Sequence, residues 1–155
     1  MSYTQSVLQP GETIVAQGRL HWVIYSGAIG ALVAGVIVVG LERKYIPDYT
    51  IIIAATALLF GALFAGTFMH AWFKRFITEF AITNRRVIYK RGLIWRKTVE
   101  MNMDKVATVD VDQSVLGRML DYGKVQVFSA GGGQGIDVRE SIASPIALRN
   151  AITAK

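Results

Sequence analysis

Two long apolar stretches, residues 22–41 and 50–73, dominate the first half of the chain, and neither contains Lys, Arg, Asp or Glu. Each is at least as long as the roughly 20 residues that a helix needs to cross a bilayer core of about 30 Å. Only residues 42–49 separate them, so the pattern predicts a transmembrane helical hairpin. The first stretch exceeds the 7–15 apolar residues typical of a signal peptide, so we expect it to be retained.

Small residues recur at every fourth position in both stretches: Gly27, Ala31 and Gly35 in the first, and Ala57, Gly61 and Ala65 in the second. This spacing lets helix backbones approach closely in lipid. The simpler interpretation is packing of the two helices on each other, and the alternative is contact with another subunit. The histidines His21 and His70 lie at the boundaries of the two stretches, where we expect them to be passive.

From Phe76 onward the apolar residues recur with a period of two, which is typical of strands with one buried face. The pattern predicts strands at 76–82, 86–90, 93–103, 107–112, 122–129 and 136–140. The clearest of them alternates Ala107, Val109 and Val111 with polar residues. Ser144, an N-cap residue, and Pro145 then predict the start of a C-terminal helix. We therefore expect a mainly β domain at 74–155, a closed or nearly closed barrel with the helix at one end.

The segment before the hairpin, residues 1–21, has two interpretations. Residues 13–19 partly alternate and could form a strand that joins the C-terminal domain. Alternatively, the whole segment is an irregular cytoplasmic juxtamembrane leader. We expect Ser114 to Asp121, between two predicted strands, to be a helix or a loop.

Basic residues concentrate directly after the hairpin. The stretch 74–97 holds eight bases and one acid, Glu79, whereas the loop at 42–49 has two of each. The positive-inside rule then places both termini in the cytoplasm of a multi-pass protein of the inner (plasma) membrane. The eight bases are our candidates for a lipid or partner surface: Lys74, Arg75, Arg85, Arg86, Lys90, Arg91, Arg96 and Lys97. The alternative is that they only set the topology.

Residues suited to catalysis are sparse. The chain has no Cys and two His, and its Ser residues have no His and Asp companions at a recognisable spacing. The acids Asp110 and Asp112 fall on the polar side of a predicted strand, where a solvated face is expected. The glycine tract at 131–135 is not followed by Lys-Ser/Thr, so it is not a P-loop. We expect no enzymatic activity, no catalytic residue, no cofactor and no metal.

Three runs carry a resemblance to a known family: ITNRRVIYKRGLIWRKT from Ile82, MDKVATVDVDQSVLGRMLDYGKVQV from Met103, and SPIALRNAI from Ser144. They resemble the bacterial pleckstrin-homology-like domain of membrane-flanked proteins, in which a pair of transmembrane helices usually precedes the domain. The family's usual Pro-Leu is replaced here by Asn102-Met103, which does not threaten the fold. The resemblance implies a pleckstrin-homology-like barrel and implies no reaction.

These observations together favour a non-enzymatic membrane protein whose cytoplasmic domain is an assembly or interaction module. The expected partners are anionic membrane lipids and either a second copy or another membrane protein, with no nucleic acid. The alternative is a ligand-binding or regulatory subunit of a transporter or envelope enzyme complex.

Overall fold

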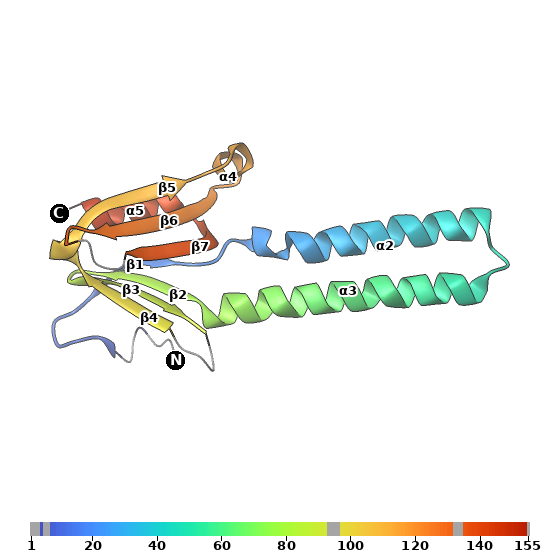
Figure 1. Cartoon of the computed structure of the whole chain (residues 1–155), viewed down its shortest axis with the longest axis horizontal. Coiled ribbons are helices and arrows are strands. Elements are labelled where there is room, and N and C mark those ends of the chain that lie inside the picture. The colour runs from blue at the N-terminus through green and yellow to red at the C-terminus, as the bar shows by residue number, and fades with distance from the viewer. Residues whose placement is uncertain (1–3, 5–6, 93–96, 132–134, 155) are drawn as a thin grey trace. The chain divides into compact units, whose positions relative to one another are not determined.

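The computed structural model describes residue 4 and residues 7–92, 97–131 and 135–154 (Figure 1). The chain divides into two compact units. One is the hairpin unit, Trp22–Lys74, and the other is the β-rich unit, which combines Met1–His21 with Arg75–Lys155. The segment before the hairpin is therefore part of the β-rich unit, and the interpretation as an irregular leader is wrong for the strand it contains.

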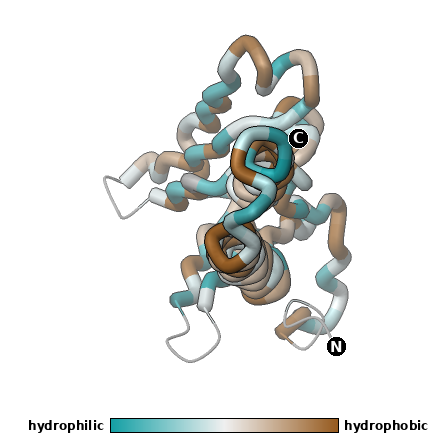
Figure 2. Tube along the Cα trace, turned by 90° about the vertical axis from the view of Figure 1, so that its right-hand side faces the viewer, coloured by the Kyte–Doolittle hydropathy of each residue, from teal (hydrophilic) through white to brown (hydrophobic). Residues whose placement is uncertain are grey.

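The hairpin unit consists of a short 3-10 helix, Trp22–Tyr25, and the long helices α2, Ser26–Tyr45, and α3, Thr50–Ile77. Both long helices meet the length and hydropathy expected of a membrane span. Figure 2 looks at them nearly end-on and shows mainly hydrophobic or neutral positions along their turns. Each helix runs four residues beyond its expected end, at Leu41 and at Phe73, because no helix breaker follows either position.

The two long helices pack on each other through a small residue. A Cβ atom at Gly35 of α2 would lie only 2.7 Å from the Cβ of Phe60 of α3. Near the loop, the Thr56 hydroxyl donates a hydrogen bond to Glu42 Oε1 at 3.0 Å. By contrast, a Cβ atom at Gly27 or Gly61 would meet nothing within 4 Å. Packing within the hairpin is thus confirmed for Gly35, whereas Gly61 stays open.

The β-rich unit contains two antiparallel sheets, one with strand order β1-β2-β3-β4 and one with order β5-β6-β7. The strands of the first sheet are β1 Ile14–Gly18, β2 Glu79–Thr83, β3 Arg86–Arg91 and β4 Lys97–Asn102. Those of the second are β5 Val106–Asp112, β6 Tyr122–Ser129 and β7 Ile136–Ala143. Strand β1 pairs with β2, which confirms the interpretation of residues 13–19 as a strand of the C-terminal domain.

One strand prediction needs correction, and a second is confirmed in part. Phe76 and Ile77, expected in a strand, belong to α3, and β2 begins only at Glu79. Alternation over so few residues does not distinguish a strand from the last turn of an apolar helix. The strand expected at 93–103 is observed as β4, and residues 93–96 lie outside the described residues.

A closed barrel does not form among the described residues. Strands β4 and β5 are separated by a 3-10 turn, Met103–Lys105, and belong to different sheets. The sheets are joined elsewhere, where the chain beyond β1 crosses to β7. There, the His21 amide donates to the Ser141 carbonyl at 2.8 Å, and the Ala143 amide donates to the Arg19 carbonyl at 2.9 Å. Leu20 and Ile142 form an isolated bridge between these two bonds.

Both sheets contribute to one hydrophobic core, and helix α5, Pro145–Thr153, packs against β1 and β2 of one sheet and β5 and β6 of the other. The fully buried side chains of the core include Ile82, Val87, Val125, Val127, Ile136, Val138 and Ile142. The predicted helix start is confirmed at Pro145, but Ser144 does not cap the helix with its side chain. Its hydroxyl donates instead to Asp121 Oδ2 at 2.6 Å.

Candidate functional site

One end of the β-rich unit is where the chain leaves for the hairpin and returns from it. Strand β1 ends at Gly18, which pairs with Phe80 near the start of β2. His21 is followed directly by Trp22 of the hairpin unit, and Arg75 directly follows Lys74 of the same unit. We call this part of the β-rich unit, residues 18–21 and 75–80 with their sheet neighbours, the junction end.

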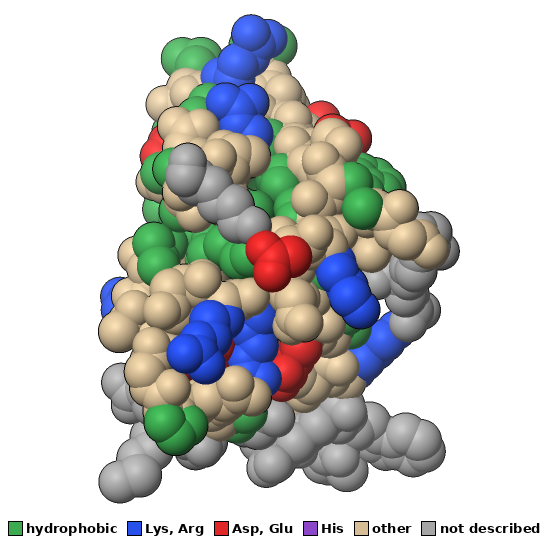
Figure 3. All heavy atoms as spheres, turned by 90° about the vertical axis from the view of Figure 1, so that its left-hand side faces the viewer, with side chains coloured by type: hydrophobic (Ala, Val, Ile, Leu, Met, Phe, Trp, Pro, Cys, Tyr) green, Lys and Arg blue, Asp and Glu red, His purple; other side chains and the backbone are tan. Residues whose placement is uncertain are grey.

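The strand register divides the predicted basic cluster into two groups. Lys90 pairs with Glu79, and Arg91 pairs with Lys97, so these bases lie at the junction end. Arg85 lies in the turn between β2 and β3, at the other end of the sheet. Five strand residues at about 3.3 Å each put roughly 15 Å between the two groups. Figure 3 shows a single face of the molecule, on which the Lys and Arg side chains lie in separate patches.

The exposed members of the cluster among the described residues are Arg75, Arg85, Arg91 and Lys97. Lys74 is half-buried on α3, and Arg96 lies outside the described residues. Lys90 is also half-buried, with its Nζ 3.9 Å from Glu79 Oε1. The exposed members of the cluster at the junction end are therefore Arg75, Arg91 and Lys97.

Arg86 is committed to an internal network. Its Nε and one terminal nitrogen donate to the two carboxylate oxygens of Glu12, both at 2.9 Å. Its other terminal nitrogen donates to Glu100 Oε2 at 2.7 Å. The Glu12 side chain is fully buried, and the Arg86 hydrogen bonds are the main cause that lowers the pKa of Glu12 to about 2. The hydrogen bonds to Glu12 also raise the pKa of Arg86. Because Glu12 belongs to the N-terminal segment, these bonds hold that segment against the sheet.

A second internal network connects the two sheets. The Tyr89 hydroxyl of β3 donates to Glu140 Oε2 of β7 at 2.9 Å, and Arg91 lies 3.2 Å from Glu140 Oε1. Burial, followed by the nearby charge of Glu140, raises the pKa of Tyr89. Because Glu140 is itself buried, the ion pair with Arg91 compensates the charge of this carboxylate.

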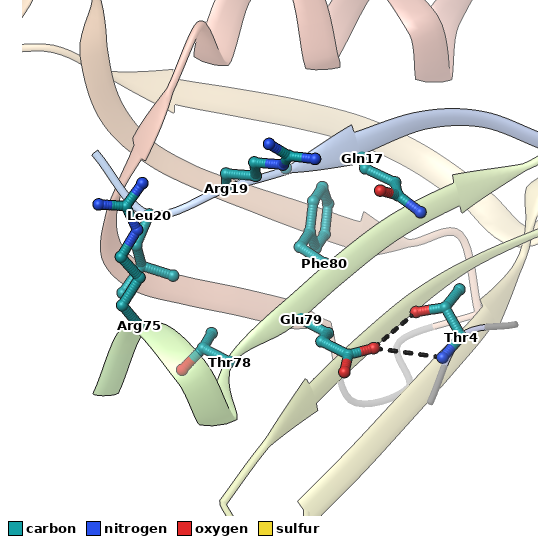
Figure 4. A pocket seen from close by; sticks show the side chains of 9 residues that line it. Thr4, Gln17, Arg19, Leu20, Arg75, Thr78, Glu79 and Phe80 are labelled. Carbon is teal, nitrogen blue, oxygen red and sulfur yellow. Dashed lines mark hydrogen bonds between the residues drawn. The ribbon is translucent and has the colours of Figure 1, made fainter. Parts of the chain in front are cut away.

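A pocket of about 300 Å³ lies at the junction end, lined by residues of β1, α3 and β2 (Figure 4). Arg19 and Arg75 bring two guanidinium groups to it, and Figure 4 shows Arg75 extending past Leu20. Glu79, also in the lining, accepts hydrogen bonds from the Thr4 amide at 3.2 Å and from the Thr4 hydroxyl at 2.9 Å. The Thr78 hydroxyl is buried and has no hydrogen-bond partner among the described residues.

The remaining sequence candidates occupy ordinary positions. Asp110 and Asp112 are exposed on the outer face of β5, opposite Gln126 and Lys124 of β6, as expected of a solvated face. His21 is buried, and its ring stacks on that of Tyr122 with centroids 5.2 Å apart. Within the described part of the chain, no three His, Cys, Asp or Glu side chains are grouped so as to hold a metal.

Sequence reasoning missed one surface. Helix α4, Val115–Met119, and the following Leu120 expose several large apolar side chains. The available signal was the four large apolar residues among positions 115–120, interrupted only by Gly117 and Arg118, inside a segment expected to be a helix or loop.

Comparison with known families agrees with this architecture. The model of the bacterial PH domain family matches residues 23–154, which cover nearly all of the hairpin unit and the part of the β-rich unit that follows it, but not strand β1. The chain therefore belongs to the bacterial PH domain family. No curated protein and no solved structure matches it.

Proposed function

We propose that the chain is a non-enzymatic assembly protein of the inner membrane. Its hairpin binds a partner helix, from a second copy or from another membrane protein, and both of its termini lie in the cytoplasm. Its PH domain is held at the anionic inner surface. The observation that carries the proposal is an apolar groove of about 270 Å³ on the hairpin unit. Leu32, Gly35, Val36 and Val39 of α2 line it together with Ala57, Phe60, Gly61 and Phe64 of α3.

The groove suits a partner helix because its lining includes small residues of α3 that are not buried by packing within the hairpin. Ala57 is exposed, and Gly61 is open to solvent or lipid on the side where a side chain would project. In a bilayer, apolar surface alone gives no attraction between helices, so close approach over small residues supplies the packing energy. The small-residue spacing of α3 thus favours an intermolecular role, while that of α2 at Gly35 serves the hairpin.

Gly61→Leu tests the groove, with Gly66→Leu as its matched control. A Cβ atom at either glycine meets nothing within 4 Å, but only Gly61 lines the groove. We expect full-length protein extracted in native nanodiscs to have a mass above that of one chain plus lipid. Gly61→Leu should reduce it to the single-chain mass, and Gly66→Leu should not. A single-chain mass for the unmodified protein, with no co-extracted membrane protein, would contradict the proposal.

The lipid contact of the proposal rests on the bases of the junction end. Each Lys or Arg near an anionic surface contributes roughly 1 kcal/mol, and covalent attachment keeps these residues within reach of the bilayer. Arg75 and Lys97 are exposed and are not involved in the networks of Arg86 and Glu140. The test uses energy transfer from a dye at Thr98→Cys to acceptor-labelled lipid, with the full chain in nanodiscs.

We expect transfer to rise with anionic lipid and to fall with salt. Arg75→Gln with Lys97→Gln should abolish the lipid dependence. Arg85→Gln with Lys105→Gln removes the same charge from the other end of the β-rich unit and should preserve it. If the lipid dependence of the energy transfer were the same in both double variants, the bases of the junction end would act only as topology signals.

A second candidate function, a ligand-binding regulatory subunit, is favoured by the pocket at the junction end. Two arginines and a buried hydroxyl without a partner among the described residues suit a small phosphate-like anion. Thermal unfolding of the full chain with inorganic phosphate tests it. We expect stabilisation that is lost in Arg19→Gln and in Thr78→Val, and an unchanged midpoint in the unmodified protein would exclude this site.

A further inference from the structure

The segment between β5 and β6 forms an apolar knob, which we define as Val115, Leu116, Met119 and Leu120. These residues are 68%, 62%, 77% and 42% exposed, respectively. Arg118, within the same turn, is exposed as well. Single exposed apolar residues are common on protein surfaces, but a contiguous group marks a site of interaction.

Specific contacts hold the apolar knob in place. The Ser114 hydroxyl accepts a hydrogen bond from the Gly117 amide at 3.0 Å and thereby caps α4. The Gln113 side-chain amide donates to the Tyr122 carbonyl at 3.2 Å and closes the loop at its base. Gly117 approaches the same carbonyl so closely that a Cβ atom there would lie 2.6 Å from its oxygen. The local structure therefore fixes these apolar side chains in an outward position.

The apolar knob lies at the junction end of the β-rich unit. Tyr122 follows it by two residues, and its ring stacks on His21, the last residue before the hairpin unit. Tyr122 also pairs with Ala143, whose amide donates to the Arg19 carbonyl. These contacts all lie within the β-rich unit. His21 is bonded directly to Trp22, so only a few residues of chain separate the junction end from the first predicted span.

We propose that the apolar knob docks into the interfacial layer of the bilayer that holds the hairpin. The covalent link keeps the bilayer surface at a high effective concentration, so a few side chains suffice to orient the domain. Large apolar side chains beside a basic residue are the composition that binds at the boundary between headgroups and acyl chains. This docking does not depend on the apolar groove or on a protein partner.

The chain has no Cys, so single labels report on defined positions. Met119→Cys places an environment-sensitive dye on the apolar knob, and Ala130→Cys places it on an exposed residue just beyond the other end of β6. Eight residues of strand separate the two sites by about 25 Å. The full chain is reconstituted at one copy per nanodisc, and quenching by brominated lipid is compared with quenching by aqueous iodide.

We expect brominated lipid to quench the dye at position 119 severalfold more than the dye at 130, and iodide to show the opposite order. Adding Val115→Ser and Leu116→Ser should return the dye at 119 to iodide access, with circular dichroism showing an unchanged fold. Iodide access at 119 equal to that at 130 would overturn the proposal. So would protection at 119 that appears only with a second copy or an added protein, because the knob would then be a protein interface.

Discussion

At the scale of single residues, the most consequential side chain of the β-rich unit is Glu12, a buried carboxylate of the N-terminal segment that is bonded to residues of β2 and β3. It accepts hydrogen bonds from Arg86 at 2.9 Å and from the Thr83 hydroxyl at 2.7 Å. Removing one partner of a buried ion pair leaves the other without compensation, which costs more than the pair itself contributes.

Glu12→Gln should therefore lower the free energy of unfolding by roughly 2–4 kcal/mol, because Arg86 loses its main partner. Glu100→Gln removes the more exposed partner of the same guanidinium and should cost less than about 1 kcal/mol. Amide exchange of the β1–β2 pairs in nanodiscs would measure both. Equal losses in the two variants would contradict the assignment of Glu12 as the main anchor.

The same carboxylate predicts a pH dependence. The pKa of Glu12 is lowered from 4.5 to about 2, so the folded state holds fewer protons than the unfolded state between these values. Its contribution is complete above about pH 4.5 and is lost as the pH falls toward 2, at most about 3 kcal/mol. We expect β1 to lose exchange protection over this range. In Glu12→Gln this component of the pH profile should be absent, and an unchanged profile would assign it to other groups.

At the scale of elements, the sequence pattern was most informative where one face is buried and the other is solvated. Strand β6 has the bounds expected from its alternation, and Val109 of β5 is buried between exposed neighbours. The pattern failed at the end of α3, where Phe76 is apolar and exposed within a helix. The local alternation of apolar and polar residues cannot identify an exposed apolar position such as Phe76, because the surroundings of that side chain are not encoded in the neighbouring residues.

Helix packing within the hairpin gives a prediction at this scale. Gly35→Ala places a methyl group 2.7 Å from Phe60 Cβ, so the helices must separate or shift, at a cost of roughly 1–3 kcal/mol. Gly40→Ala, on the same helix, meets nothing within 4 Å and should be neutral or slightly stabilising. Thermal unfolding of the two variants in detergent would compare them. A Gly35→Ala protein as stable as Gly40→Ala would show that Gly35 is not a packing contact.

At the scale of the whole molecule, sequence reasoning treated neighbouring bases as one surface, whereas the β2–β3 hairpin carries Arg85 and Arg91 to opposite ends of a strand. It also predicted a domain at 74–155, whereas the β-rich unit includes strand β1 from before the hairpin. The first error arises from the length of the single strand β3, and the second from a pairing between residues far apart in sequence. The pairing of β1 with β2 spans the entire hairpin, so the partial alternation of residues 13–19 indicated a possible strand but not its partner.

This pairing predicts which fragments fold. In a fragment of residues 75–155 alone, β2 becomes an edge strand, because its neighbour β1 is missing. Phe80 also loses its contact with Gly18, which packs so closely on the Phe80 ring that a Cβ atom at Gly18 would lie 2.7 Å from it. The fragment also lacks Glu12, the ion-pair partner of Arg86. We expect this fragment to be partly unfolded and prone to association through the exposed edge.

Replacing Trp22–Lys74 with a flexible Gly/Ser linker should restore a cooperative soluble fold, because Leu20 and Arg75 line one pocket and a short linker spans them. Circular dichroism and the dispersion of amide resonances would compare this protein with the fragment 75–155. Ala16→Pro in the linked protein is the control, since proline removes an amide from the middle of β1 and should reproduce the behaviour of the fragment. A fragment 75–155 with the same melting temperature as the linked protein would show that β1 is dispensable.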